Sequence, residues 1–173
     1  MKAITISAKP LITSILFDFI AVVFIFLVPS ISHLVGIPLY ILDPMRCALF
    51  FAILFTNKKN TYTIALLLPM VSFLISSHPY FYKVFLISSE LVINVWLFYF
   101  FAEKFKNVFF ITLTSIIISK AIYYLFKFIL MGFLSINDSL VSTSITIQLF
   151  VALALSIIMT IFFRKQIAQA DKE

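Results

Sequence analysis

The sequence predicts an all-α integral membrane protein, folded as a bundle of six transmembrane helices. Hydrophobic residues make up 63% of the 173 residues and charged residues only 12%, whereas soluble domains are about 45–50% apolar and about 25% charged. The mean hydropathy is +1.15. This apolar excess must face lipid. Strands of a membrane barrel need a polar lumen face, and these runs are apolar in every direction, so helices are expected.

Six apolar runs, separated by short polar breaks, define the expected spans. A helix that crosses a bilayer needs about 20 residues, so six spans nearly fill the chain. We therefore predict one transmembrane domain, residues 1–173. The predicted spans are Leu11–Pro29, Pro38–Thr56, Thr61–Ser76, Phe81–Ala102, Val108–Leu134 and Ser144–Phe163.

The distribution of basic residues predicts the orientation. Three of the predicted loops, Ser30–Ile37, Ser77–Tyr80 and Ser135–Thr143, carry no Lys or Arg. The two ends of the chain and the loops after spans two and four carry Lys2, Lys9, Lys58, Lys59, Lys104, Lys106, Arg164, Lys165 and Lys172. By the positive-inside rule both termini are predicted to be cytoplasmic. The net charge of +6 suits anionic lipid headgroups and calls for no nucleic acid.

Several functional classes find no support in the composition. The single cysteine, Cys47, excludes an internal disulfide and a thiolate metal cluster, and we expect it to be shielded in the bundle or the lipid. Two glycines in the whole chain exclude a phosphate-cradling loop. With His33 and His78 as the only histidines, an intramembrane hydrolase is also disfavoured. We predict no catalytic residues, no metal and no cofactor.

Seven charged residues within the predicted spans are the main indication of function. These residues are Asp18, Asp43, Arg46, Lys83, Glu90, Lys120 and Lys127. Each ionised group at mid-membrane costs about 2.5–3.5 kcal/mol on insertion scales, so a buried cluster or a wet cavity is expected. Their positions along the spans place all of them except Asp18 in the outer half of the membrane.

Helix periodicity groups several of these side chains. Lys83, Glu90 and Asn94 share one face of span four, and Lys120 shares a face with Lys127 on span five. Lys83 and Glu90 are about 10 Å apart along the axis, roughly the length of a small polar molecule. We therefore predict an outward-facing pocket. The predicted substrate-binding residues are Lys83, Glu90, Asn94, Arg46, Lys127 and Lys120. Basic groups outnumber acidic ones, which favours an anionic or zwitterionic solute.

The same residues also have structural interpretations. Asp43 and Arg46 are three residues apart and can pair locally. Asp18 and Lys120 can form a structural ion pair near the midplane. The outer lysines of spans four and five can snorkel to the interface. Hydrogen bonds between helices can account for Glu90 and the amide on its face.

Two stretches resemble a known family. HPYFYKVFLISSELVINVWLFYF, a short Pro-containing loop followed by K-x6-E-L-x2-N, is similar to the fourth-helix region of the substrate-binding (S) components of energy-coupling factor (ECF) transporters. LDPMRCALFFAILF resembles the preceding region, and the resemblance covers roughly Ile37 to Met131. Where the family commonly carries A-x-x-x-A, this chain has Ser14, Asp18 and Ala21.

The resemblance implies a multi-pass subunit of the bacterial cytoplasmic (inner) membrane. In that family, the S component captures a vitamin or metal ion outside and docks on a transmembrane coupling subunit with two cytoplasmic ATPases. We thus expect a substrate-capturing subunit of an uptake transporter that binds a small polar, vitamin-like solute. The alternative is a non-transporting membrane scaffold of an envelope or cell-shape complex, in which the charges are structural.

Overall fold

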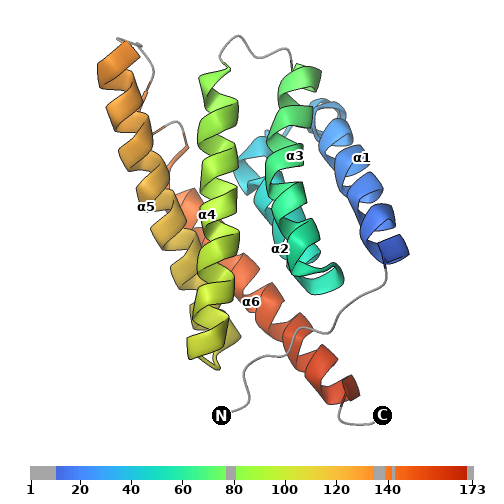
Figure 1. Ribbon diagram of the computed structural model, residues 1–173. Helices are drawn as coiled ribbons and strands as arrows, with labels where there is room; N and C mark the ends of the chain where they lie inside the picture. Colours follow the sequence, from blue (N-terminus) through green and yellow to red (C-terminus); the bar gives the residue numbers. More distant parts are fainter. Residues whose placement is uncertain (1–10, 77–80, 135–138, 142, 171–173) are drawn as a thin grey trace.

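The computed structural model describes residues 11–76, 81–134, 139–141 and 143–170, and within these ranges it is helical with no strand (Figure 1). The elements are α1 (Leu11–Val35), the short 3-10 helix η1 (Leu39–Leu42), α2 (Pro44–Phe55), α3 (Lys58–Ser76), α4 (Tyr82–Lys104), α5 (Val108–Leu134) and α6 (Ile145–Ala170). The predicted all-α class is therefore confirmed, and each predicted span overlaps one of the six α-helices, although the second span also contains η1.

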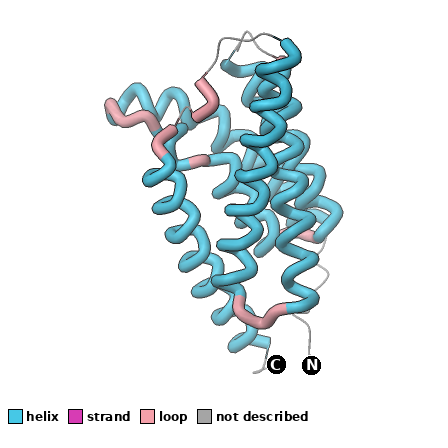
Figure 2. Tube along the Cα trace, turned by 90° about the vertical axis from the view of Figure 1, so that its left-hand side faces the viewer, coloured by secondary structure: helices cyan, strands magenta, loops and turns pink. Residues whose placement is uncertain are grey.

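The helices run alternately up and down the bundle (Figure 1). α4 packs between α3 and α5, α1 packs on α2 and α3, and α6 runs obliquely against α5 and α2 (Figures 1 and 2). The α2–α3 and α4–α5 turns, the start of α1 and the last turn of α6 lie at the same end of the bundle, the lower end in Figure 1. We call it the basic end because Lys106 lies in the α4–α5 turn and the adjoining helix ends carry Lys58, Lys59 and Lys104.

Four of these helices, α1, α4, α5 and α6, are long and apolar enough to cross a membrane, among the residues that the structure describes. α2 is the clearest exception. It has 12 residues, which rise about 18 Å, whereas the hydrocarbon core is about 30 Å thick. The coarse prediction of a helical membrane protein thus holds, while α2 is shorter than the predicted second span.

The first span is longer than predicted. We expected it to end at Pro29, but α1 continues through this proline to Val35. Proline is tolerated inside transmembrane helices because neighbouring groups can satisfy the freed backbone carbonyl. α1 ends instead before Gly36, whose φ of +69° is the left-handed conformation that commonly terminates a helix.

The second span is not the single helix that we predicted. Its first part is η1, and Asp43 then adopts a left-handed backbone conformation (φ 51°, ψ 60°) before α2 begins. Pro44 accounts for the break, because the residue before a proline is sterically disfavoured in the right-handed helical region. Pro44 itself fits the first position of α2, where no backbone N–H is needed.

The other boundaries are closer to the prediction. α4 and α5 lie within two residues of the predicted spans, while α3 begins at Lys58 and α6 extends to Ala170. Large apolar side chains such as Leu11, Phe19 and Phe128 are exposed on the outside of the bundle, with more than half of their surface accessible. Such a surface is expected where helices face lipid.

The interior differs between its two ends. Towards the basic end, aromatic rings from α2, α4 and α6 fill the core. Phe98 meets Phe50 edge-on with ring centroids 6.1 Å apart, and it meets Phe163 at 6.2 Å. Phe51 meets Phe162 edge-on at 6.0 Å. We call this region the aromatic half and the opposite one, which contains a cavity, the hollow half.

Candidate functional site

A cavity of about 370 Å³ lies in the hollow half, where η1 meets α2. All six α-helices and η1 contribute to its wall. Its volume falls at the lower end of the roughly 300–1,000 Å³ typical of small-molecule sites. The polar and aromatic lining residues are Tyr40, Asp43, Arg46, Ser72, Glu90, Lys120, Tyr123, Tyr124, Thr143 and Gln148.

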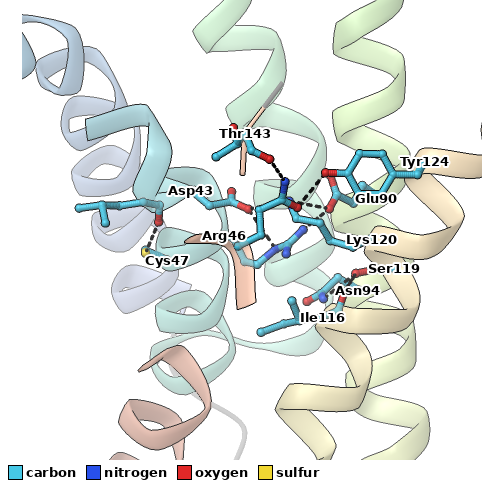
Figure 3. Close-up of polar contacts among 12 residues, drawn as sticks. Asp43, Arg46, Cys47, Glu90, Asn94, Ile116, Ser119, Lys120, Tyr124 and Thr143 are labelled. Atoms are coloured by element: carbon cyan, nitrogen blue, oxygen red, sulfur yellow. Dashed lines mark hydrogen bonds and ion pairs between the residues drawn. The ribbon is translucent and has the colours of Figure 1, made fainter. Parts of the chain in front are cut away.

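Four charged side chains meet in this wall, and we call them the charge quartet: Asp43, Arg46, Glu90 and Lys120 (Figure 3). Arg46 donates a hydrogen bond from Nη2 to Oε1 of Glu90, and its Nε lies 3.5 Å from Oδ2 of Asp43. The Nζ atom of Lys120 lies 3.4 Å from Oδ2 of Asp43 and 3.5 Å from Oε1 of Glu90. Each cation therefore contacts both carboxylates.

The quartet has an inner and an outer pair. The side chains of Arg46 and Glu90 are only 3% and 7% exposed. Those of Lys120 and Asp43 are 23% and 28% exposed. Arg46 and Glu90 therefore form the buried pair of the wall, and Lys120 and Asp43 form the more exposed pair, which a molecule in the cavity can reach more easily.

The break before α2 positions two members of the quartet. Asp43 ends η1 and precedes Pro44, so its side chain projects from the junction rather than from a regular helix. Its carbonyl oxygen accepts backbone hydrogen bonds from Arg46 (3.0 Å) and Cys47 (3.1 Å), which start α2. The predicted local pair of Asp43 and Arg46 is present, although it spans a helix start rather than a helical turn. Cys47 is half-buried against the core.

A chain of hydrogen bonds joins α5 to α6 beside the quartet. The hydroxyl of Tyr124 donates to Oε1 of Gln148 at 2.8 Å, and Nε2 of Gln148 donates to the carbonyl oxygen of Thr143 at 2.7 Å. Gln148 is not among the site residues predicted from the sequence. It was detectable, because it is the only amide side chain in the sixth apolar run, where a polar group needs a partner.

Asn94 lies below the cavity rather than in its wall (Figure 3). It is fully buried and donates from Nδ2 to the hydroxyl of Ser119 at 3.0 Å, which connects α4 to α5. Its Oδ1 atom has no hydrogen-bond partner among the described residues. Asn94 was predicted to bind substrate, but the structure places it in a helix–helix contact about one turn below Glu90.

Two predicted lysines also lie away from the cavity wall. Lys127 is buried, with 2% of its surface exposed, and its Nζ donates to the carbonyl oxygen of Ser139 at 2.6 Å. Its side chain therefore reaches the segment that follows α5 and does not line the cavity. Lys83 is half-buried in the first turn of α4, about two turns above Glu90.

The predicted pair of Asp18 with Lys120 is wrong. Asp18 accepts a hydrogen bond from Nδ2 of Asn60 at 2.6 Å, whereas Lys120 contacts Asp43 and Glu90. The packing order explains the difference, because α1 contacts α2, α3 and η1, while α5 contacts α4 and α6. Similar depth in the membrane does not bring together two helices that are separated by others.

The chemistry of this site must be inferred from its own geometry. Comparisons with protein-family models, curated proteins and solved structures find no match. Within the described part of the chain, no three His, Cys, Asp or Glu side chains gather as a metal ion would require. The cavity instead offers one accessible cation, one accessible carboxylate, tyrosine rings and a carboxamide, which are groups that recognise a polar organic molecule.

Proposed function

We propose that this protein is a substrate-capturing subunit of an uptake transporter, and that its cavity binds a small polar solute. One observation carries the proposal: the accessible pair of Lys120 and Asp43 faces a cavity of about 370 Å³ inside a membrane bundle. Placing an ionisable residue within a membrane costs free energy, and such residues mark substrate pathways when they line a cavity. A purely structural pair would need no cavity beside it.

The distribution of basic residues supports an outward-facing cavity. Lys58, Lys59, Lys104 and Lys106 lie at the basic end, and the cavity lies in the opposite half. The positive-inside rule assigns the basic end, and with it both termini, to the cytoplasm. Residues 1–10, 77–80, 135–138, 142 and 171–173 lie outside the described residues, so the contributions of Lys2, Lys9, Lys172 and most of the second and third predicted outer loops rest on sequence. A reporter fused to the carboxyl end tests this topology, and activity only from a periplasm-requiring reporter would contradict it.

A capture subunit needs an energy source elsewhere. With only two glycines, the chain has no phosphate-cradling loop with which to use ATP. In this proposal the protein resides in the bacterial inner membrane and docks on a transmembrane coupling subunit with cytoplasmic ATPases, as its resemblance to ECF S components implies. The four membrane-length helices support residence in a membrane.

One observation favours a second function. The charges of the quartet are all paired with each other, as a scaffold that uses them only to join helices would require. In that case the protein would organise an envelope or cell-shape complex, and its partners would be other proteins. The two functions differ in what stays bound after purification.

Native mass spectrometry of the gently purified protein distinguishes them. Under the transport proposal, a small molecule co-purifies with the wild type and with Lys83→Met, a control outside the cavity wall. Its occupancy falls in Gln148→Leu, because the carboxamide at the cavity wall is lost. A preparation that carries no small molecule but retains a stoichiometric envelope or cytoskeletal protein would overturn the transport proposal.

A further inference from the structure

The cavity wall combines balanced charges with aromatic rings, and from this we propose that its ligand is an aromatic zwitterion. Such a molecule carries one carboxylate, one ammonium group and one ring, as an aromatic α-amino acid does. This inference rests on the proposed function and narrows its substrate class. Three features support it: the net charge of the cavity, the accessible pair of opposite charges, and the tyrosines that line the same cavity.

The net charge of the quartet is zero. The predicted excess of basic residues included Lys83 and Lys127, and neither lies in the cavity wall. What remains is two cations and two carboxylates, each in contact with both groups of opposite charge. A ligand with a net charge would leave one charge without a partner in a poorly solvated site, which is costly. A ligand of net charge zero preserves the balance.

The accessible pair has the arrangement that a zwitterion needs. Nζ of Lys120 and Oδ2 of Asp43 are 3.4 Å apart, and both side chains are partly exposed. A ligand carboxylate can bind Lys120 while its ammonium group binds Asp43, so one ion pair is exchanged for two charge-assisted contacts. Meanwhile Arg46 and Glu90 neutralise each other in the less exposed part of the wall.

Three tyrosines line the same cavity as this pair. Tyr40 comes from η1, and Tyr123 and Tyr124 come from α5, the helix that also carries Lys120. Tyr124 is held by its hydrogen bond to Gln148, which fixes the position of its ring. Aromatic rings favour offset or edge-on contacts with one another, so a ligand ring gains more here than an aliphatic chain does. The volume of about 370 Å³ suits a molecule with a single ring.

Three matched probes test the charge requirement. L-phenylalanine, 3-phenylpropionate and phenethylamine share a ring and a two-carbon chain, but they are a zwitterion, an anion and a cation. Binding is measured on the full-length protein in lipid nanodiscs. We expect phenylalanine to bind at least about tenfold more tightly than either other probe, because each of those lacks one charge-assisted contact.

Variants of the accessible pair should change the preference in opposite directions. Asp43→Asn, which keeps a residue type tolerant of the left-handed backbone, should make 3-phenylpropionate the tightest probe. Lys120→Gln should make phenethylamine the tightest. Lys83→Gln, a charge removed outside the wall, should leave the wild-type order unchanged. If one cavity variant does not fold, the other still tests the assignment.

Two results would overturn the inference. One is a wild type that prefers a singly charged probe, or that shows no preference among the three or binds none. The other is an order of affinities that Asp43→Asn and Lys120→Gln leave unchanged. The proposed function fails separately, through the absence of any co-purifying small molecule. A co-purifying molecule with a net charge would reject the zwitterion and leave the capture function intact.

Discussion

The hollow half and the aromatic half of the bundle are filled in opposite ways. In the aromatic half, rings from α2, α4 and α6 interlock around Phe98, which is 1% exposed. In the hollow half, the same three helices contribute charged or amide side chains around an unfilled volume, among them Arg46, Glu90 and Gln148. The Asn94–Ser119 hydrogen bond lies between the two regions.

This difference indicates that one part of each helix stabilises the bundle and the other part lines the cavity. Close packing of large side chains supplies stability that a cavity cannot, because empty volume forfeits dispersion contacts. The aromatic half can therefore hold the helices together while the hollow half retains space and buried charge. The division predicts that substitutions in the two halves differ in kind, and the following variants test it.

The largest effect should come from Phe98→Ala. Phe98 contacts the rings of Phe50, Tyr99 and Phe163, so truncation leaves a cavity in the aromatic half. We expect the free energy of unfolding to fall by about 3–5 kcal/mol. Reversible unfolding in lipid measures it, and Phe110→Ala, on an exposed face, serves as control. A loss of less than about 1 kcal/mol would mean that packing here is not what stabilises the bundle.

Glu90→Gln should have the next largest effect. It leaves Arg46 buried without its closest counter-charge, a change that typically costs about 3–5 kcal/mol. We expect about 3 kcal/mol, the lower end of that range, because Asp43 still lies beside Arg46. The double variant Arg46→Met/Glu90→Leu should regain most of the lost stability, since it removes both buried charges. If the double variant were no more stable than Glu90→Gln, the unpaired charge of Arg46 would not be the cause of the lost stability.

Tyr124→Phe should have the smallest effect. It removes the hydroxyl that donates to Gln148 and leaves that carboxamide oxygen without this donor, at a cost of about 1 kcal/mol in unfolding free energy. Probe affinity should fall as well, because the position of the ring is less restricted. Tyr62→Phe provides the matched control, since Tyr62 lies on α3 outside the cavity wall. Equal changes in the two variants would argue against the Tyr124–Gln148 bond as an ordered part of the site.

The helices could largely be predicted from apolar runs, because a helix in lipid satisfies its own backbone. Two of the errors lie at prolines. Pro29 was taken as an end and lies inside α1, whereas Pro44 was overlooked and separates η1 from α2. A helix can continue through a proline where neighbouring groups hydrogen-bond to the carbonyl that the proline leaves free. The apolar pattern of a single helix does not show those neighbours.

The site could be predicted only in part, for a related reason. Arg46, Glu90 and Lys120 were identified because ionised groups at mid-membrane need partners. Lys83 shares a helix face with Glu90, and helix periodicity predicts this shared face. It does not predict how far the cavity extends along the helix axis, and the cavity ends before it reaches Lys83. Lys127 bonds to a carbonyl in the following loop, a partner that only the folded chain supplies.

The closeness of Asp43 to Arg46 also matters while the chain is being synthesised. Arg46 precedes its final partner Glu90 by 44 residues, so α2 leaves the ribosome before α4 exists. In the proposed topology Arg46 enters the membrane, where an unpaired arginine costs up to about 2.5–3.5 kcal/mol during translocon-mediated insertion. Asp43, three residues away, can neutralise Arg46 in that interval. A nascent chain truncated before Tyr82 should therefore integrate less efficiently with Asp43→Asn than without it, as glycosylation mapping would report.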